Sequence, residues 1–91
     1  MTKYELYKLL IDQCGAQNQT NVAIEEMAEL TKEIIKSKRG QENFAEIAEE
    51  IADVDIMLEQ LRMIYDCSET CAMIKRQKLD RIEKRLRLNE L

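Results

Sequence analysis

Apolar residues recur at intervals of three and four along the whole chain, which is the spacing of amphipathic helices and not of strands. The sequence contains no proline and only two glycines, at positions 15 and 40, which are natural places for helices to end. We therefore predict four helices and no strands. They cover about residues 3–13, from the "AQNQTN" stretch to residue 36, 43–65 and 66–88.

The connections between these helices carry residues that favour helix N-termini. The "AQNQTN" stretch is expected to be a connector, and "SKRGQEN" a turn between the second and third helices. Side-chain caps are expected from Asn18, Thr20 or Asn21 for the second helix, from Asn43 with Glu46 for the third, and from Asp66 with Glu69 for the fourth.

The third predicted helix is apolar on two sides. One stripe comprises Ile47, Ile51, Val54, Leu58 and Leu61, and a roughly opposite one comprises Ala45, Ala52, Ile56 and Met63. A helix with two apolar sides needs packing partners on both of them. We expect an all-α, four-helix bundle-like protomer that is completed by homo-oligomerisation, as a homodimer or a dimer-of-dimers tetramer.

Length and composition limit the function classes. The 91 residues fit one small domain, 1–91, and such a chain buries little surface unless it associates. The absence of histidine excludes histidine general bases, histidine metal ligands and Ser-His or Cys-His nucleophiles. The N-terminus carries interspersed charges, so we expect no signal peptide, no membrane span and a cytoplasmic location.

The three cysteines do not form a recognisable metal motif. Cys67 and Cys71 are four positions apart and could present two thiols on one helix face. The favoured interpretation is that these are small semi-buried thiols in a reducing cytosol.

Two similar stretches, "EEMAEL" and "EEIADVD", contain acidic pairs with i, i+3 spacing, so the members of each pair share a helix face. Glu26 lies as far before the Arg39–Gly40 junction as Asp53 lies after it, and Glu29 and Glu50 are related in the same way. A simple antiparallel hairpin would thus place all four carboxylates at matching levels. The rotation of each helix is not determined by this spacing, and such pairs can also be a solvated face.

Four clustered carboxylates raise one another's pKa unless a cation compensates them. Oxygen ligands without histidine or cysteine suit Mg²⁺ or Mn²⁺ better than zinc or copper. The sequence therefore predicts a magnesium site formed by Glu26, Glu29, Glu50 and Asp53.

The acidic motifs also resemble those of a known family. "EEMAE" followed by "EEIAD", within residues 22–61, is similar to the EExxE…ExxD pattern of the MazG-like all-α nucleoside triphosphate pyrophosphohydrolases, with weaker similarity in "KLDRIEKRL". The resemblance implies a helical oligomer that binds Mg²⁺ through these four acids. It implies cleavage of (d)NTPs between the α and β phosphates, giving a nucleoside monophosphate and pyrophosphate. Glu25 matches the first glutamate of the motif, and we assign it a helper role, either in orienting or activating water or in holding a second metal.

The last predicted helix is basic although the net charge of the chain is −4. Residues 75–87 contain seven basic and two acidic side chains, and Lys78, Arg81 and Arg85 share a face that could bind the phosphates of a substrate. The same charge could be an ordinary solvated face stabilised by the helix dipole. A nucleic-acid partner is not expected, because the segment is short and carries no aromatic platform.

Two function classes follow from these features. The first is metal-assisted hydrolysis of a nucleoside triphosphate, with nucleotide-pool housecleaning as its purpose. The second is a non-catalytic helical interaction or regulatory module whose acids bind a basic partner. The pattern does not identify the nucleotide.

Overall fold

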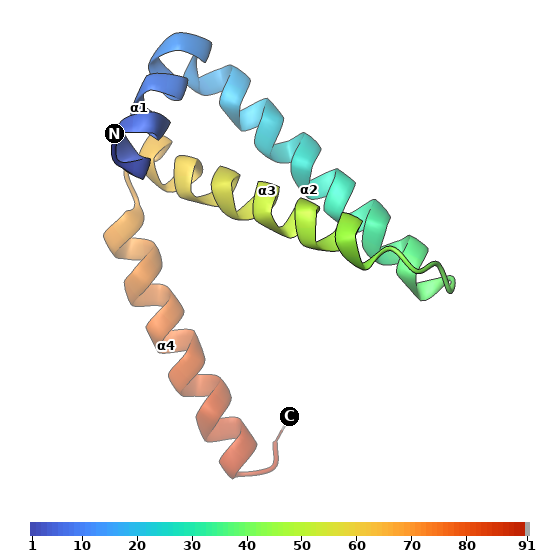
Figure 1. The fold of residues 1–91 in the computed structure, drawn as a ribbon. Helices are drawn as coiled ribbons and strands as arrows, with labels where there is room; N and C mark the ends of the chain where they lie inside the picture. The colour runs from blue at the N-terminus through green and yellow to red at the C-terminus, as the bar shows by residue number, and fades with distance from the viewer. Residues whose placement is uncertain (91) are drawn as a thin grey trace.

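The computed structural model describes residues 1–90, and this part of the chain is all-helical, as predicted. Its four helices are α1 (Lys3–Cys14), α2 (Ala16–Lys38), α3 (Phe44–Ile64) and α4 (Ser68–Arg87) (Figure 1). No strand occurs in residues 1–90. Leu91, the last residue of the predicted domain 1–91, lies outside the described residues.

The predicted connector after α1 is wrong, because α2 begins directly at Ala16. Gly15 alone separates the two helices, with φ 91°, a conformation that is open to glycine and strained for other residues. The Thr20 hydroxyl donates to the Ala16 carbonyl oxygen at 2.6 Å, within the helix. Asn18, Thr20 and Asn21 are therefore interior helical residues and not caps, since one glycine is enough to redirect the chain.

Helices α2 and α3 form a long antiparallel hairpin, closed by a turn at the residues predicted for it (Figure 1). Gly40, with φ 94°, follows the end of α2. Its N–H donates to the Ser37 carbonyl and the N–H of Gln41 donates to the Lys36 carbonyl, which is a Schellman closure. The hairpin thus turns at the glycine from which the matching levels of the acidic residues were predicted.

The predicted side-chain caps of α3 and α4 are also corrected. Asn43 precedes α3, but its side chain makes no capping bond to that helix and instead contacts α2. Asp66 does not open α4, because it adopts φ 50° and ends α3 in a second Schellman closure, with the Cys67 N–H donating to the Arg62 carbonyl. Cys67 is the N-cap residue of α4.

The interior formed by α1 and the hairpin contains amides as well as apolar groups. Tyr7, Ala23 and Met57 are buried, and Gln60 is the largest side chain that is fully buried. Gln19 Nε2 donates to Gln60 Oε1 at 2.8 Å, so one buried hydrogen bond joins the two amides between α2 and α3, and Gln60 Nε2 donates to Met57 Sδ at 3.6 Å. These two residues lie equally far from the Arg39–Gly40 junction, and their contact confirms the hairpin register.

Helix α4 leaves the hairpin at the end where α1 packs, and extends away from it (Figure 1). The radius of gyration is 16.5 Å, against about 12 Å for a compact chain of this length. The accessible surface of 7403 Å² exceeds the roughly 5,500 Å² typical of this mass by about a third. The fourth helix therefore does not complete a bundle within one chain.

Large apolar side chains remain exposed on this surface. On α3, Ile51 and Leu58 from one predicted stripe and Ile56 from the other are exposed. On α4, the exposed apolar side chains include Met73, Ile74, Leu79, Ile82 and Leu86. Among residues 1–90, no helix combines the length and the apolar run needed to cross a bilayer.

Candidate metal site between α2 and α3

Three of the four predicted ligands meet between the helices of the hairpin. Glu26 of α2 and Glu50 and Asp53 of α3 each offer a carboxylate oxygen, and these oxygens all lie within 4.8 Å of one another. Glu50 and Asp53 share a face of α3 because of their i, i+3 spacing, and Glu26 faces them from the opposite helix. All three residues are half-buried.

The cluster is electrostatically uncompensated. Burial raises the pKa of the Glu26 carboxyl, and the neighbouring Glu50 and Asp53 carboxyls raise it further. Glu50 Oε2 is buried and has no hydrogen-bond partner among the described residues. A buried acceptor of this kind is costly unless a proton or a cation reaches it. The site is thus chemically suited to a hard cation.

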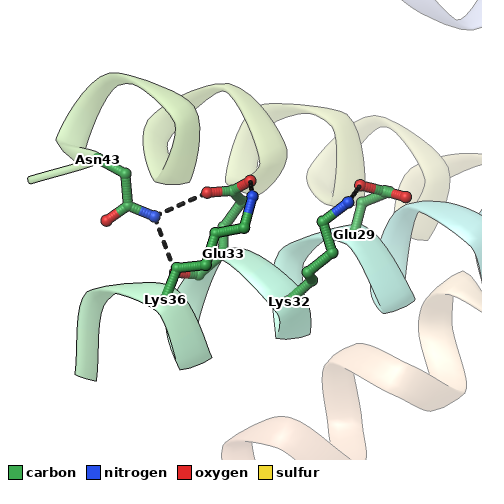
Figure 2. Close-up of polar contacts among 5 residues, drawn as sticks. All are labelled: Glu29, Lys32, Glu33, Lys36 and Asn43. Carbon is green, nitrogen blue, oxygen red and sulfur yellow. Dashed lines mark hydrogen bonds and ion pairs between the residues drawn. The ribbon is translucent and has the colours of Figure 1, made fainter. Parts of the chain in front are cut away.

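The fourth predicted ligand, Glu29, lies outside the cluster. Its side chain is exposed, and its Oε2 lies 3.4 Å from the Nζ of Lys32 on the same helix (Figure 2). Glu29 lies at the predicted level along the hairpin. The side of α2 that faces α3 contains Gln19, Ala23 and Glu26, and the exposed Glu29 is rotated outward from that side.

Glu33 shows how a carboxylate in the same hairpin becomes fully satisfied. Asn43 Nδ2 donates to Glu33 Oε2 at 2.7 Å and to the Glu33 carbonyl oxygen at 2.9 Å (Figure 2). The Asn43 hydrogen bond, with smaller help from Lys36 at 3.3 Å, lowers the pKa of Glu33. Glu33 is therefore a structural acid, in contrast to Glu26, whose pKa is raised.

The remaining predicted site residues are accessible but separate from the cluster. Glu25 is exposed on α2. Lys78, Arg81 and Arg85 line one shallow hollow on α4 together with Ile82, so the structure brings the three basic side chains together. Within one chain these residues belong to α4, which extends away from the α2–α3 hairpin (Figure 1).

Sequence reasoning missed two features near these sites. The Gln19–Gln60 pair could have been found from its equal distance to the turn, the same signal that placed Glu26 opposite Asp53. The contact between Asn43 and Glu33 had no comparable signal, because Asn43 before a helix is typical of a cap.

The fold and site together define an all-α chain with a carboxylate cluster between two antiparallel helices. Comparison with protein-family models, with curated proteins and with solved structures finds no match to this chain.

Proposed function

We propose that this chain is a magnesium-dependent nucleoside triphosphate pyrophosphohydrolase. The reaction would hydrolyse the bond between the α and β phosphates of a (d)NTP and release a nucleoside monophosphate and pyrophosphate. The observation that carries the proposal is the convergence of Glu26, Glu50 and Asp53, with oxygens within 4.8 Å of one another, at residues that resemble the MazG-like motif.

The three carboxylates fit the proposed cation. They supply only oxygen donors, which suits Mg²⁺ or Mn²⁺, and three acids leave positions for water and phosphate oxygens. Glu50 Oε2 is buried, has no hydrogen-bond partner within residues 1–90 and is available as a ligand atom. Glu29 would act as a fourth ligand after its side chain turns from Lys32. When bound, the cation supplies neutralisation of phosphate charge and polarisation of the phosphoryl group.

The other residues are assigned to substrate and water. Glu25 would accept a proton from the attacking water, since it is an exposed carboxylate next to Glu26. Lys78, Arg81 and Arg85 would bind the outer phosphates. Because these three lie on α4, we propose that the α4 of a second copy brings them to the hairpin. The exposed apolar side chains of α4 support such an assembly.

Pyrophosphate release tests the reaction. Purified protein is incubated with a panel of canonical and modified nucleoside triphosphates, with Mg²⁺ or with EDTA. We expect Mg²⁺-dependent release that Glu50→Gln lowers by about 10–100-fold, the usual loss when a metal site is disturbed. Glu49→Gln, which changes the exposed neighbour, serves as the matched control and should keep full activity.

The outcomes separate the reaction from the site. If no triphosphate yields pyrophosphate, the enzymatic proposal fails. If the Glu50→Gln variant retains wild-type activity, the site assignment fails even though the chain is an enzyme. Sedimentation at micromolar concentration tests the assembly, and a stable monomer there would contradict the role given to α4.

Cation binding is measured independently of activity. Saturating Mn²⁺ at about 100 times its Kd should stabilise the wild type by about 2.7 kcal/mol in thermal unfolding. Glu26→Gln should remove most of this stabilisation, whereas Glu25→Gln should retain it, because Glu25 is not one of the three clustered acids. Equal Mn²⁺ stabilisation of the Glu26→Gln variant would exclude the cluster as the binding site.

A helical interaction module is the second candidate, and the extended α4 favours it. Within Ser68–Arg87 no side chain is buried, and apolar and basic residues are both available for a partner. This candidate is preferred if two results are found together: the chain releases no pyrophosphate from any triphosphate, and Mn²⁺ does not change its unfolding temperature.

A further inference from the structure

Two thiols lie side by side at the base of α4. The Sγ atoms of Cys67 and Cys71 are 3.5 Å apart, and both residues are half-buried. Cys67 is the N-cap residue, with φ −126°, and Cys71 lies in the first turn, where its N–H donates to the Cys67 carbonyl at 2.8 Å. The backbone therefore holds the two residues at a defined separation.

This separation is compatible with a disulfide. Four residues of helix span about 6 Å along the axis. Bridged cysteines have Cα atoms about 4.4–6.8 Å apart, with sulfurs about 2.05 Å apart. Because the backbone of Cys67 is not helical, its Sγ can approach Cys71 by side-chain rotation without breaking the first turn of α4.

A basic hollow gives access to Cys71 of this pair. It is lined by Arg62 of α3 and by Ser68, Cys71, Ala72 and Lys75 of α4. Arg62 and Lys75 place positive charge beside the Cys71 thiol, which favours an anionic reagent. Cys14, the remaining cysteine, is exposed on α1.

We propose that Cys67 and Cys71 form a reversible oxidation site that reacts with an anionic, low-molecular-mass disulfide. The thiolate of one cysteine attacks a sulfur of the reagent, forming a mixed disulfide and releasing one equivalent of thiol. The thiolate of the other cysteine then attacks the protein sulfur of the mixed disulfide and releases the second equivalent. Two protein thiols are oxidised, the reagent is reduced to two thiols, and the two protons lost by the cysteines end on those thiols.

The product would fix the start of α4. A Cys67–Cys71 bond joins the N-cap residue to the first turn, directly after the Schellman closure at Asp66 that ends α3. The modification therefore acts on the base of the helix that carries the basic hollow of Lys78, Arg81 and Arg85, and it does not depend on any enzymatic activity.

Oxidised glutathione is the probe, and mass spectrometry with thiol counting is the readout. In a Cys14→Ser background we expect the mass to fall by two hydrogens and both thiols to disappear, with reversal by dithiothreitol. Adding Cys71→Ser should instead leave a stable glutathione adduct on Cys67 or no reaction. Circular dichroism of each variant checks that the helices are retained.

Mass spectrometry and thiol counting also show the results that would contradict the proposal. Two glutathione adducts on one chain, or two free thiols under conditions that oxidise a dithiol peptide of the same residues 67–71, would overturn the proposal. A Lys75→Gln variant tests the hollow, and it should slow the reaction with oxidised glutathione but not with the neutral bis(2-hydroxyethyl) disulfide. Equal slowing with both reagents would show that the positive charge does not select the reagent.

Discussion

Helices α2, α3 and α4 have similar lengths, yet the α2–α3 hairpin and α4 differ in how their faces are used. In the hairpin, buried polar pairs such as Gln19–Gln60 and Asn43–Glu33 join the two helices. In α4, the Arg87–Glu83 ion pair joins residues of one helix, and both side chains are exposed. An amphipathic pattern therefore shows that a helix needs a partner, but not whether the same chain provides it.

The two proposed binding functions also lie in different parts of the molecule. The candidate cation ligands lie in the hairpin, where both backbone elements are held by buried contacts. The candidate phosphate ligands lie on α4, whose position relative to the hairpin depends on the short connection after Ile64. Cation binding and phosphate binding should thus be separable by mutation.

The largest expected effect comes from breaking the buried amide pair of the hairpin. Gln60→Leu leaves the Gln19 amide buried without its partner, which should cost about 2–3 kcal/mol. For a chain of this size, that corresponds to a fall in Tm of about 10–20 °C, measurable by circular dichroism.

The double variant provides the control for this effect. Replacing both Gln19 and Gln60 by leucine removes both polar groups together, and it should restore much of the lost stability. A double variant as unstable as Gln60→Leu would show that packing around Met57, and not amide pairing, stabilises this part of the hairpin.

A smaller loss is expected at the junction of α1 and α2. Gly15 has φ 91° and ψ 141°, a region that side-chain-bearing residues rarely adopt, although a Cβ there would meet no atom within 4 Å. Gly15→Ala should therefore cost about 1–2 kcal/mol through backbone strain alone. Urea unfolding measures this loss of stability. Gln17→Ala, at an exposed position within α2, is the control and should change the stability little.

The number of helices and their C-terminal ends were largely predictable, because apolar spacing and the two glycines are local signals. The start of α2 at Ala16 and the residues that cap the later helices were not. The level of Glu26 opposite Asp53 was predictable too, since an antiparallel hairpin with a known turn has one simple register. The outward position of Glu29 was not, because it depends on the rotation of α2. The direction of α4 was equally inaccessible, since it follows from the Asp66 conformation and from few contacts to the hairpin.

A pH-dependent effect is expected at the turn end of the hairpin. The Asn43 hydrogen bond lowers the pKa of Glu33 in the folded chain. The stabilisation that this hydrogen bond gives the fold is therefore fully present above the ordinary glutamate pKa. It is lost as the pH falls through the lowered pKa of Glu33 in the folded chain. Asn43→Ala should therefore destabilise the chain at neutral pH. The difference in unfolding temperature between this variant and the wild type should become smaller as the pH is lowered.

Thermal unfolding between neutral and acidic pH measures that gap. Glu42→Ala, at the exposed residue before Asn43, should show no comparable narrowing. A gap that stays constant with pH would mean that Asn43 stabilises the turn without acting on the Glu33 carboxylate.

The smallest expected effect is on α4. Glu83→Gln removes the 2.7 Å ion pair with Arg87, but both partners are exposed, so the stability should change by no more than about 0.5 kcal/mol. Chemical denaturation followed by helical signal checks this. A loss as large as that of Gln60→Leu would show that α4 is integrated into the folded core after all.

The buried amide pair has a consequence for the cation site that we propose. Gln19 and Gln60 lie about two helical turns, or about 10 Å, from Glu26 and Asp53 along the hairpin. Their hydrogen bond opposes the sliding of α2 along α3. Sliding alters the gap between opposing oxygens, and that gap discriminates a small cation such as Mg²⁺ from a larger one such as Ca²⁺. The size of ion that the proposed site would accept is thus expected to depend on two uncharged side chains that lie about two turns away from it.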